Sequence, residues 1–267
     1  MVIWSDNIKE YLIELNKEDG FGNAGNVYYL KELSDENDTY PAGEALNLLV
    51  KSGSATAVVN GMSLDTNCPT TEIWLFGAMG QDMIDLVDAL SDKYTGINSE
   101  IHVFDQEVAN FLVQRGAEIY DETLEFVGQN LRLEAAEDIC KITEKQLEIL
   151  SELEDENISL YCGQIPLDQD NCAVYGKMEK KTPITICTLE FNHNGFLSIV
   201  EPIWVYTSAN YRNKGLAKSC VSHALHSVGE NVVVLYHTEA DNKPSIKLAK
   251  ALGLTLNNKC FSLAVDL

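Results

Sequence analysis

The stretch "YTSANYRNKGLAKS", residues 206–219, carries Arg212, Lys214 and Gly215 in a short turn between an apolar run and a helix-like run. The residues before this turn, "SIVEPIWVYT" (198–207), are β-branched and aromatic, which predicts a strand. Apolar side chains recur at helical spacing after Gly215. The sequence therefore predicts a strand, a basic turn and a helix in succession.

The turn has two readings, which are a solvated helix start and a phosphate site. Backbone N–H groups at a helix start are unpaired and carry the positive end of the helix dipole, so they attract anions. Gly215 would let a phosphate approach the backbone closely. The spacing is not that of a Walker P-loop, but the strand, basic turn and helix start together favour phosphate. Pro202 predicts an irregularity in the pairing of the preceding strand, and Gly229 suits the helix end.

Two motifs around this turn resemble those of the GNAT superfamily of acyl-CoA N-acyltransferases. Arg212-x-x-Gly215-x-Ala217 matches its Q/R-x-x-G-x-G/A motif, and "VYTSANYRNKGLA" is similar to the signature of one two-lobed branch. "EADNKPSIKLAKALGL" (239–254) is similar to the second motif of the family. The resemblance covers roughly residues 140–267, whereas the first half resembles only a degenerate partner lobe.

The resemblance implies that acetyl-CoA is the cosubstrate, with its pyrophosphate at the helix start and its pantetheine arm along the strand. It also implies that a backbone N–H near Val205 polarises the acyl carbonyl. The implied cofactor-binding residues are Val205, Tyr206, Thr207, Arg212, Asn213, Lys214, Gly215, Leu216, Ala217, Asn242 and Ser245. Lys243 and Lys247 could meet the outer phosphates, but solvated helix lysines are the simpler reading.

An acceptor amine must lose a proton to attack, so the site needs a base. Glu201 is the first choice because acids occur at this position in the branch resembled. Glu190 on the preceding strand is second, and Glu239 and Asp241 are third. Each of them has a competing reading as an ordinary surface carboxylate.

The general acid is left open by the sequence. Many GNAT enzymes place a tyrosine in the second motif to protonate the leaving thiolate, but here that position is Ala249. Tyr206, Tyr211 or Tyr236 could supply the proton instead, or the thiolate could leave unassisted.

The two halves of the chain read as a degenerate tandem repeat. Both place an Ile-Trp pair on the corresponding strand, at Ile73-Trp74 and at Ile203-Trp204, and both alternate strands with helices. The expected fold is α/β, with an α+β mixed sheet in tandem GNAT-like lobes over 1–135 and 136–267. The acidic, helix-periodic stretch 131–156 is expected to hold the opening helices of the second lobe.

The first lobe lacks a counterpart of the basic turn. Only "GAMGQD" (77–82) stands between its strand and helix, without a base. We expect this lobe to be degenerate, to bind no coenzyme A, and either to wall the acceptor site or to form a homodimer contact.

The charge is uneven along the chain. Residues 1–156 carry 32 acidic and 9 basic side chains, whereas the remainder carries 9 and 10. A surface with this excess of acidic side chains opposes nucleic-acid binding and could attract a cationic substrate. Solubility alone also explains the excess. The sequence has no apolar run long enough to span a membrane and lacks the layout of a secretion signal.

Seven scattered cysteines without a CxxC pair fit free thiols in the cytoplasm rather than a disulfide framework. No metal site is expected, because His223 and His226 lie one helical turn apart on a polar face without a third ligand. Cys220, on the apolar side of that helix, is expected in the core.

The sequence thus predicts an N-acetyltransferase that acts on a primary amine of a small, cationic acceptor. The alternative is a non-catalytic coenzyme-A-binding sensor or scaffold, which Ala249 and the degenerate first lobe suggest. Neither the identity of the acceptor nor the acyl chain length follows from the sequence.

Overall fold

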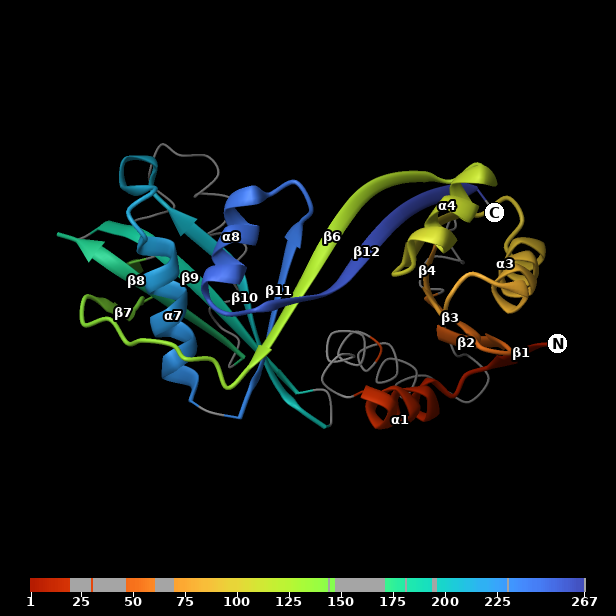
Figure 1. Ribbon diagram of the computed structural model, residues 1–267, viewed down its shortest axis with the longest axis horizontal. Coiled ribbons are helices and arrows are strands. Elements are labelled where there is room, and N and C mark those ends of the chain that lie inside the picture. Colours follow the sequence, from red (N-terminus) through yellow and green to blue (C-terminus); the bar gives the residue numbers. More distant parts are fainter. Residues whose placement is uncertain are drawn as a thin grey trace. The chain divides into compact units, whose positions relative to one another are not determined.

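The computed structural model describes residues 1–19, 30, 47–60, 70–143, 145–146, 171–180, 182–193, 196–229 and 231–266. Both halves of the chain combine strands with helices (Figure 1). In the first half they are β1 (Val2–Ser5), α1 (Ile8–Asp19), β2 (Asn47–Ser52), β3 (Ala55–Asn60), β4 (Thr70–Phe76), α3 (Gln81–Lys93), β5 (Asn98–Val103), α4 (Gln106–Gln114) and β6 (Glu118–Gln129). In the second half they are β7 (Ile139–Lys141), β8 (Cys172–Glu179), β9 (Thr182–His193), β10 (Ser198–Thr207), the 3-10 turn η1 (Ala209–Tyr211), α7 (Leu216–Val228), β11 (Val233–Glu239), α8 (Lys243–Ala251) and β12 (Thr255–Asp266).

The chain forms two compact units that interleave in sequence. The first comprises Met1–Glu125, Thr238–Asp241 and Asn257–Leu267, and the second comprises Phe126–His237 and Asn242–Leu256. The last strand, which the repeat reading assigns to the second half, pairs with β5 of the first unit through Phe261↔Val103 and Leu263↔Ile101. The two lobes predicted over 1–135 and 136–267 stay a prediction.

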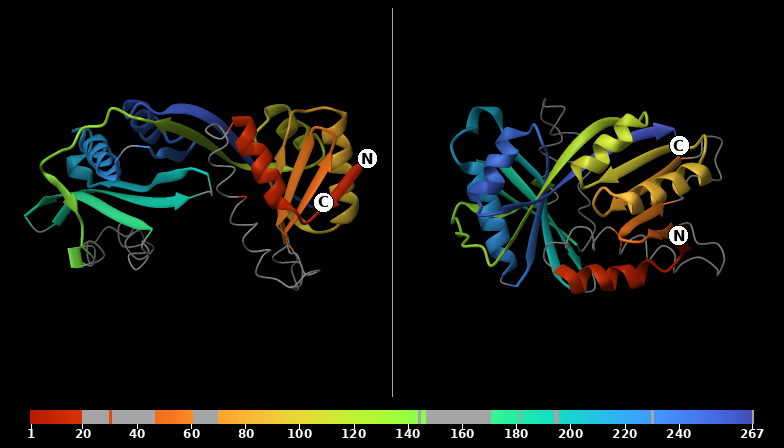
Figure 2. Two further views of the ribbon diagram at one scale, coloured as in Figure 1. Left: turned by 90° about the horizontal axis from the view of Figure 1, so that it is seen from below. Right: turned by 45° about the vertical axis from the view of Figure 1, so that its right-hand side comes forward.

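The first unit is a mixed sheet in the order β1-β2-β3-β4-β5-β12-β6. Helices α3 and α4 cover one face, where Ile73, Leu86 and Leu263 share the core. Helix α1 covers part of the other face, where Leu12 packs with Val58 and Trp74 (Figure 2). Neighbouring strand residues point to opposite faces, which explains why Ile73 and Trp74 enter different clusters.

The second unit is a mixed sheet in the order β6-β11-β10-β9-β8-β7. Helix α7 lies against β8, β9 and β10, and α8 lies beside α7. The buried side of α7 includes Cys220, Val221, Ala224 and Leu225 at helical spacing, so the core position expected for Cys220 is confirmed. The helix ends at Gly229, whose φ of 96° suits the predicted stop.

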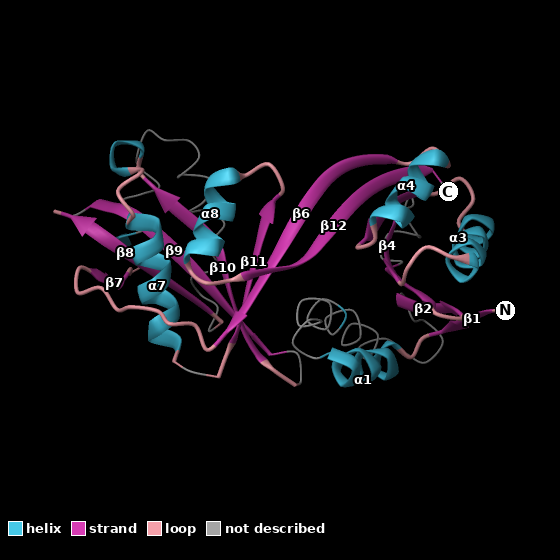
Figure 3. Ribbon diagram, viewed as in Figure 1, coloured by secondary structure: helices cyan, strands magenta, loops and turns pink. Residues whose placement is uncertain are grey.

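The helical reading of 131–156 is wrong over its first part. Residues 132–138 form no regular element, and Ile139–Lys141 is the strand β7, paired antiparallel with β8 (Figure 3). Ile139 and Ile142 are buried, so their packing onto the sheet overrides the helical periodicity of the sequence. Residues 147–156, like most of the loop "CGQIPLDQDNC", lie outside the described residues.

Candidate functional site

The start of α7 is the centre of the candidate site. Strand β10 ends at Thr207, η1 follows, and α7 begins directly after Gly215, as the sequence predicts (Figure 1). Gly215 adopts a left-handed φ of 77° and no side chain caps the helix. The first N–H groups of α7 therefore have neither an intrahelical partner nor a side-chain cap. Residues 212–215 are exposed, so this end of the helix is open to an anion.

The two basic side chains also shape the turn. The Arg212 Nε donates to the Thr207 carbonyl at 3.0 Å, and the Lys214 Nζ donates to the Asn210 carbonyl at 3.1 Å. Asn213 has a positive φ of 62°. Because only the Nε of Arg212 bonds to this carbonyl, and the described residues accept no hydrogen bond from its outer N–H groups, those groups can meet an anion. The charged groups of Arg212 and Lys214 therefore both lie beside the backbone of the turn.

Strand β10 has one edge that opens beside the turn. Its pairing with β9 shifts register between Pro202 and Trp204, which confirms the predicted irregularity. Within the described residues, β10 pairs with β11 only at Ile199 and Val200. After the bulge, β9 is the only described strand that pairs with it, so no described strand covers the edge of β10 that faces away from β9.

The backbone direction at this edge follows from one hydrogen bond. The Ser208 N–H donates to the Ile184 carbonyl of β9 at 2.9 Å. Backbone N–H groups alternate in direction along a strand, so the N–H groups of Val205 and Thr207 point away from β9. These are the donors that an extended ligand would meet along the open edge.

The first two candidates for the base lie side by side on adjacent strands. Glu201 on β10 and Glu190 on β9 are directly paired residues. The Glu201 side chain is only 11 % exposed, and its Oε1 lies 2.6 Å from the Nδ1 of His237 on β11. A buried carboxylate needs such a partner because desolvation otherwise disfavours its charge. The structure therefore joins Glu201 to an imidazole that the sequence analysis did not select.

The sequence does contain a signal for His237. In the first half, Glu72-Ile73-Trp74 is followed by His102, and in the second, Glu201-Pro202-Ile203-Trp204 is followed by His237. The glutamate and histidine are in contact in both units, at 3.0 Å for Glu72 and His102 and at 2.6 Å for Glu201 and His237. Extending the comparison of the two halves beyond the Ile-Trp pair would have found His237.

The start of α8 holds the two polar residues of the second motif. The Asn242 Oδ1 accepts from the Ser245 N–H at 3.2 Å and caps the helix. The Ser245 Oγ lies 2.7 Å from the Tyr236 hydroxyl. Both residues thus have roles within the protein itself. Ala249, at the position where many family members have tyrosine, is fully buried. Of the three tyrosines proposed as acids, Tyr236 thus has a direct hydrogen bond to that helix start.

The remaining candidates lie apart from this arrangement. Glu239 and Asp241 are exposed at the end of β11 and just beyond it. His226 is exposed, as expected for a solvated face. His223 corrects that reading, because its Nδ1 accepts from the Ala136 N–H at 3.0 Å and its ring packs edge-on to Tyr175. His223 is a packing residue of the second unit.

Comparison with protein families identifies this arrangement. Residues 136–254 match the model of the acetyltransferase (GNAT) family. The chain carries a GNAT domain. The match includes the open edge of β10, the turn at Arg212 and both helix starts. The family assignment makes the protein a transferase of the acetyltransferase class. Curated proteins yield no match to the chain.

Solved structures show the GNAT fold in tandem over nearly the whole chain. A tandem GNAT protein from the clavulanic acid biosynthesis pathway is 14 % identical, with a TM-score of 0.55 over 99 % of this chain and 98 % of that chain. A GCN5-related N-acetyltransferase from Sphaerobacter thermophilus is 11 % identical, with a TM-score of 0.53 over 88 % and 85 %. A Drosophila protein is 11 % identical, with a TM-score of 0.58 over 100 % and 98 %. At these identities the likeness concerns the fold.

Proposed function

We propose that the protein transfers an acetyl group from acetyl-CoA to a primary amine of a small, cationic acceptor. The observation that carries this proposal is the uncapped start of α7 beside the open edge of β10. A pyrophosphate suits the start of α7 because helix-start amides and two cations attract anions. An extended pantetheine arm suits the open edge of β10 because the amides of the arm can pair with the backbone there.

The backbone of β10 contributes to the chemistry in this proposal. The Val205 N–H, directed away from β9, polarises the acyl carbonyl oxygen where negative charge develops. Tyr206 and Thr207 extend the edge toward the turn. Arg212, Asn213, Lys214, Gly215, Leu216 and Ala217 form the phosphate-binding segment in this proposal, and Asn242 and Ser245 shape the neighbouring helix start.

Glu201 acts as the base in this proposal, and His237 positions it. The pair is nearly buried, so water screens the carboxylate little and the imidazole fixes its orientation. Glu190 lies opposite Glu201 and adds negative charge that favours a cationic amine. Tyr236, bonded to Ser245, is the proposed source of the proton for the leaving thiolate.

The first half of the chain supports the choice of a cationic acceptor. Residues 1–156 carry 32 acidic against 9 basic side chains, a field that raises the local concentration of cations. The described cysteines are free thiols, which agrees with a proposed cytoplasmic location. No helix in the described ranges is long and apolar enough to cross a membrane.

The test is release of free thiol from acetyl-CoA in the presence of amine panels, with polyamines, amino sugars and peptide N-termini assayed separately. We expect turnover with a small cationic amine. Acetyl-CoA binding without turnover on any class would favour the rival function of a coenzyme-A-binding sensor. Absence of both binding and turnover would contradict both functions. Longer acyl thioesters in the same assay determine the acyl preference.

A further inference from the structure

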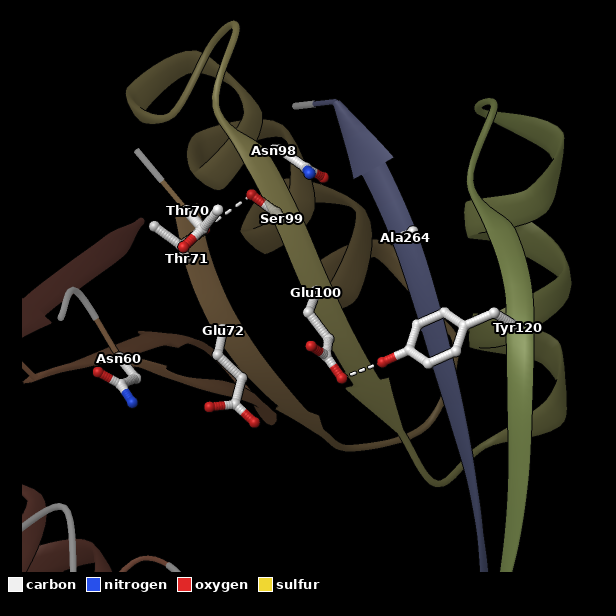
Figure 4. A pocket seen from close by; sticks show the side chains of 9 residues that line it. All are labelled: Asn60, Thr70, Thr71, Glu72, Asn98, Ser99, Glu100, Tyr120 and Ala264. Carbon is white, nitrogen blue, oxygen red and sulfur yellow. Dashed lines mark hydrogen bonds between the residues drawn. The ribbon is translucent and has the colours of Figure 1, made fainter. Parts of the chain in front are cut away.

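The first unit contains a polar cavity that the proposed transferase site does not use. It has a volume of about 420 Å³ and is lined by β3, β4, β5, β6 and β12. Figure 4 shows Glu72 and Glu100 directed into the same space, with Asn60 and Tyr120 at its sides. All these residues belong to the first unit, so the cavity is a feature of that unit alone.

A histidine completes a compact set of donor atoms beside this cavity. The His102 Nε2 lies 3.0 Å from Glu72 Oε1 and 3.4 Å from Glu100 Oε1. One ligand atom from each of these residues falls within 4.8 Å of the others. The side chain of His102 is 13 % exposed, whereas those of Glu72 and Glu100 are 37 % and 47 % exposed. The imidazole is thus at the base of the set and the carboxylates are accessible.

Neighbouring side chains hold the His102 imidazole in a fixed orientation, as metal coordination requires. The His102 Nδ1 is 3.1 Å from the Ser262 Oγ on β12. Its ring stacks on Trp74, with centroids 5.3 Å apart and planes inclined by 26°. Metal-binding histidines are commonly fixed by a second-shell hydrogen bond at the other ring nitrogen. The Tyr120 hydroxyl donates to Glu100 Oε1 and so restricts the orientation of that carboxylate.

The charge balance of the set calls for a cation. Glu72 and Glu100 are directly paired on the parallel strands β4 and β5. Like charges directly opposite each other on adjacent strands are destabilising. Within the described ranges, His102 is the only basic side chain that forms an ion pair with either of them. A bound cation would relieve this repulsion.

The geometry points to a divalent transition-metal site formed by Glu72, Glu100 and His102, with the fourth position open to the cavity. Ligands about 2.0–2.1 Å from a tetrahedral zinc ion lie about 3.3 Å apart, close to the two distances from Nε2. The imidazole favours zinc and related ions over magnesium or calcium. This inference departs from the expectation, drawn from the sequence, that the protein holds no metal.

The second unit supplies an internal comparison. It repeats the glutamate and histidine as Glu201 and His237. The residue two before His237 is the buried Leu235, whereas the residue two before His102 is Glu100. Among the described residues, the three donor atoms that come within 4.8 Å of one another are those of Glu72, Glu100 and His102, so zinc should bind to the first unit only.

The test is zinc titration of the full chain by calorimetry after chelator treatment. We expect one zinc ion per chain at this site. Affinity should fall by at least the roughly tenfold that loss of a second-shell partner costs in Glu72→Gln, Glu100→Gln and His102→Gln, because each substitution alters a ligand itself. His226→Gln, an exposed histidine of α7, is the matched control and should retain binding. Circular dichroism checks that each variant is folded.

Cobalt gives a second readout that does not depend on affinity. A tetrahedral site should give the protein visible cobalt absorption, which Glu100→Gln should abolish. Failure of the wild-type chain to bind zinc, or unchanged binding in the three variants, would overturn the proposal. Binding of 1,4-diaminobutane that depends on Glu72 and Glu100, in a chain that takes no zinc, would assign the cavity to an amine instead. Because none of these readouts requires turnover, they are independent of the proposed transferase activity.

Discussion

At the scale of single residues, the proposed catalysis depends on Glu201. Glu201→Gln preserves the shape of the side chain but removes the base, so kcat/KM should fall by about 10²–10⁴-fold, the usual contribution of general base catalysis. The limb of the pH–rate profile that reports Glu201 should also disappear. Steady-state rates across pH measure both effects. Glu190→Gln is the control and should lower the rate less. An unchanged pH–rate profile in Glu201→Gln would exclude Glu201 as the base.

His237 is a positioning residue for Glu201 in the same proposal. The 2.6 Å contact between them fixes the carboxylate, which gives this histidine of a mostly apolar strand a polar partner. This contact joins residues 36 positions apart. Its role therefore emerges from strand pairing rather than from a local motif.

The buried thiols provide a residue-level prediction on pH. Burial raises the pKa of Cys220 to about 12, from an ordinary value near 9. The native thiol should therefore resist alkylation at pH 8, because only the thiolate reacts, whereas the exposed Cys140 should be labelled. Mass spectrometry after a short pulse measures this difference. The stabilisation from keeping Cys220 protonated is complete below pH 9 and is lost as pH rises toward 12. Rapid native labelling of Cys220 would contradict its buried position.

At the scale of elements, substitutions at the two ends of α7 distinguish the effect of backbone strain from the effect of lost ligand binding. Its φ of 77° disfavours other residues, although a Cβ there would meet no atom within 4 Å. Gly215→Ala should therefore cost about 1–2 kcal/mol of stability from strain and should also weaken coenzyme A binding. Gly229→Ala is the matched control, because Gly229 has a φ of 96° and equal space at the other end of the same helix.

Chemical denaturation and calorimetry together decide this prediction. Both variants should lose stability, but only Gly215→Ala should lose affinity for coenzyme A. Equal affinity in the two variants would mean that the start of α7 does not hold the pyrophosphate.

At the scale of the whole molecule, we predict one coenzyme A per chain. Strand β4 and helix α3 are separated by residues 77–80, whereas β10 and α7 are separated by residues 208–215. Asp82 also places a carboxylate in the first turn of α3, where it accepts from the Ser54 N–H at 2.9 Å. This charge opposes a phosphate. Calorimetry on the full chain measures the stoichiometry, and two equivalents would contradict the degenerate first lobe.

The last strand provides a second prediction at this scale. Leu263 is fully buried and pairs with Ile101 in the first unit. Leu263→Ala should lower the free energy of unfolding by about 2–5 kcal/mol, as large-to-small core substitutions do. Leu256→Ala, on the same strand but 57 % exposed, should change it little. Urea unfolding followed by circular dichroism compares the two, and a small loss in Leu263→Ala would contradict the core position.

The sequence by itself determined the local features of this protein: the strand, turn and helix around Arg212 and Gly215, the cap and end glycines, and the repetition of the Ile-Trp pair. These follow from propensity, periodicity and motif spacing, which act over a few residues. Tertiary structure alone decided that Glu201 meets His237, that Glu72, Glu100 and His102 converge, and that β12 joins β5. Strand pairing brings these residues together from distant parts of the chain, and no local pattern specifies which strands become neighbours.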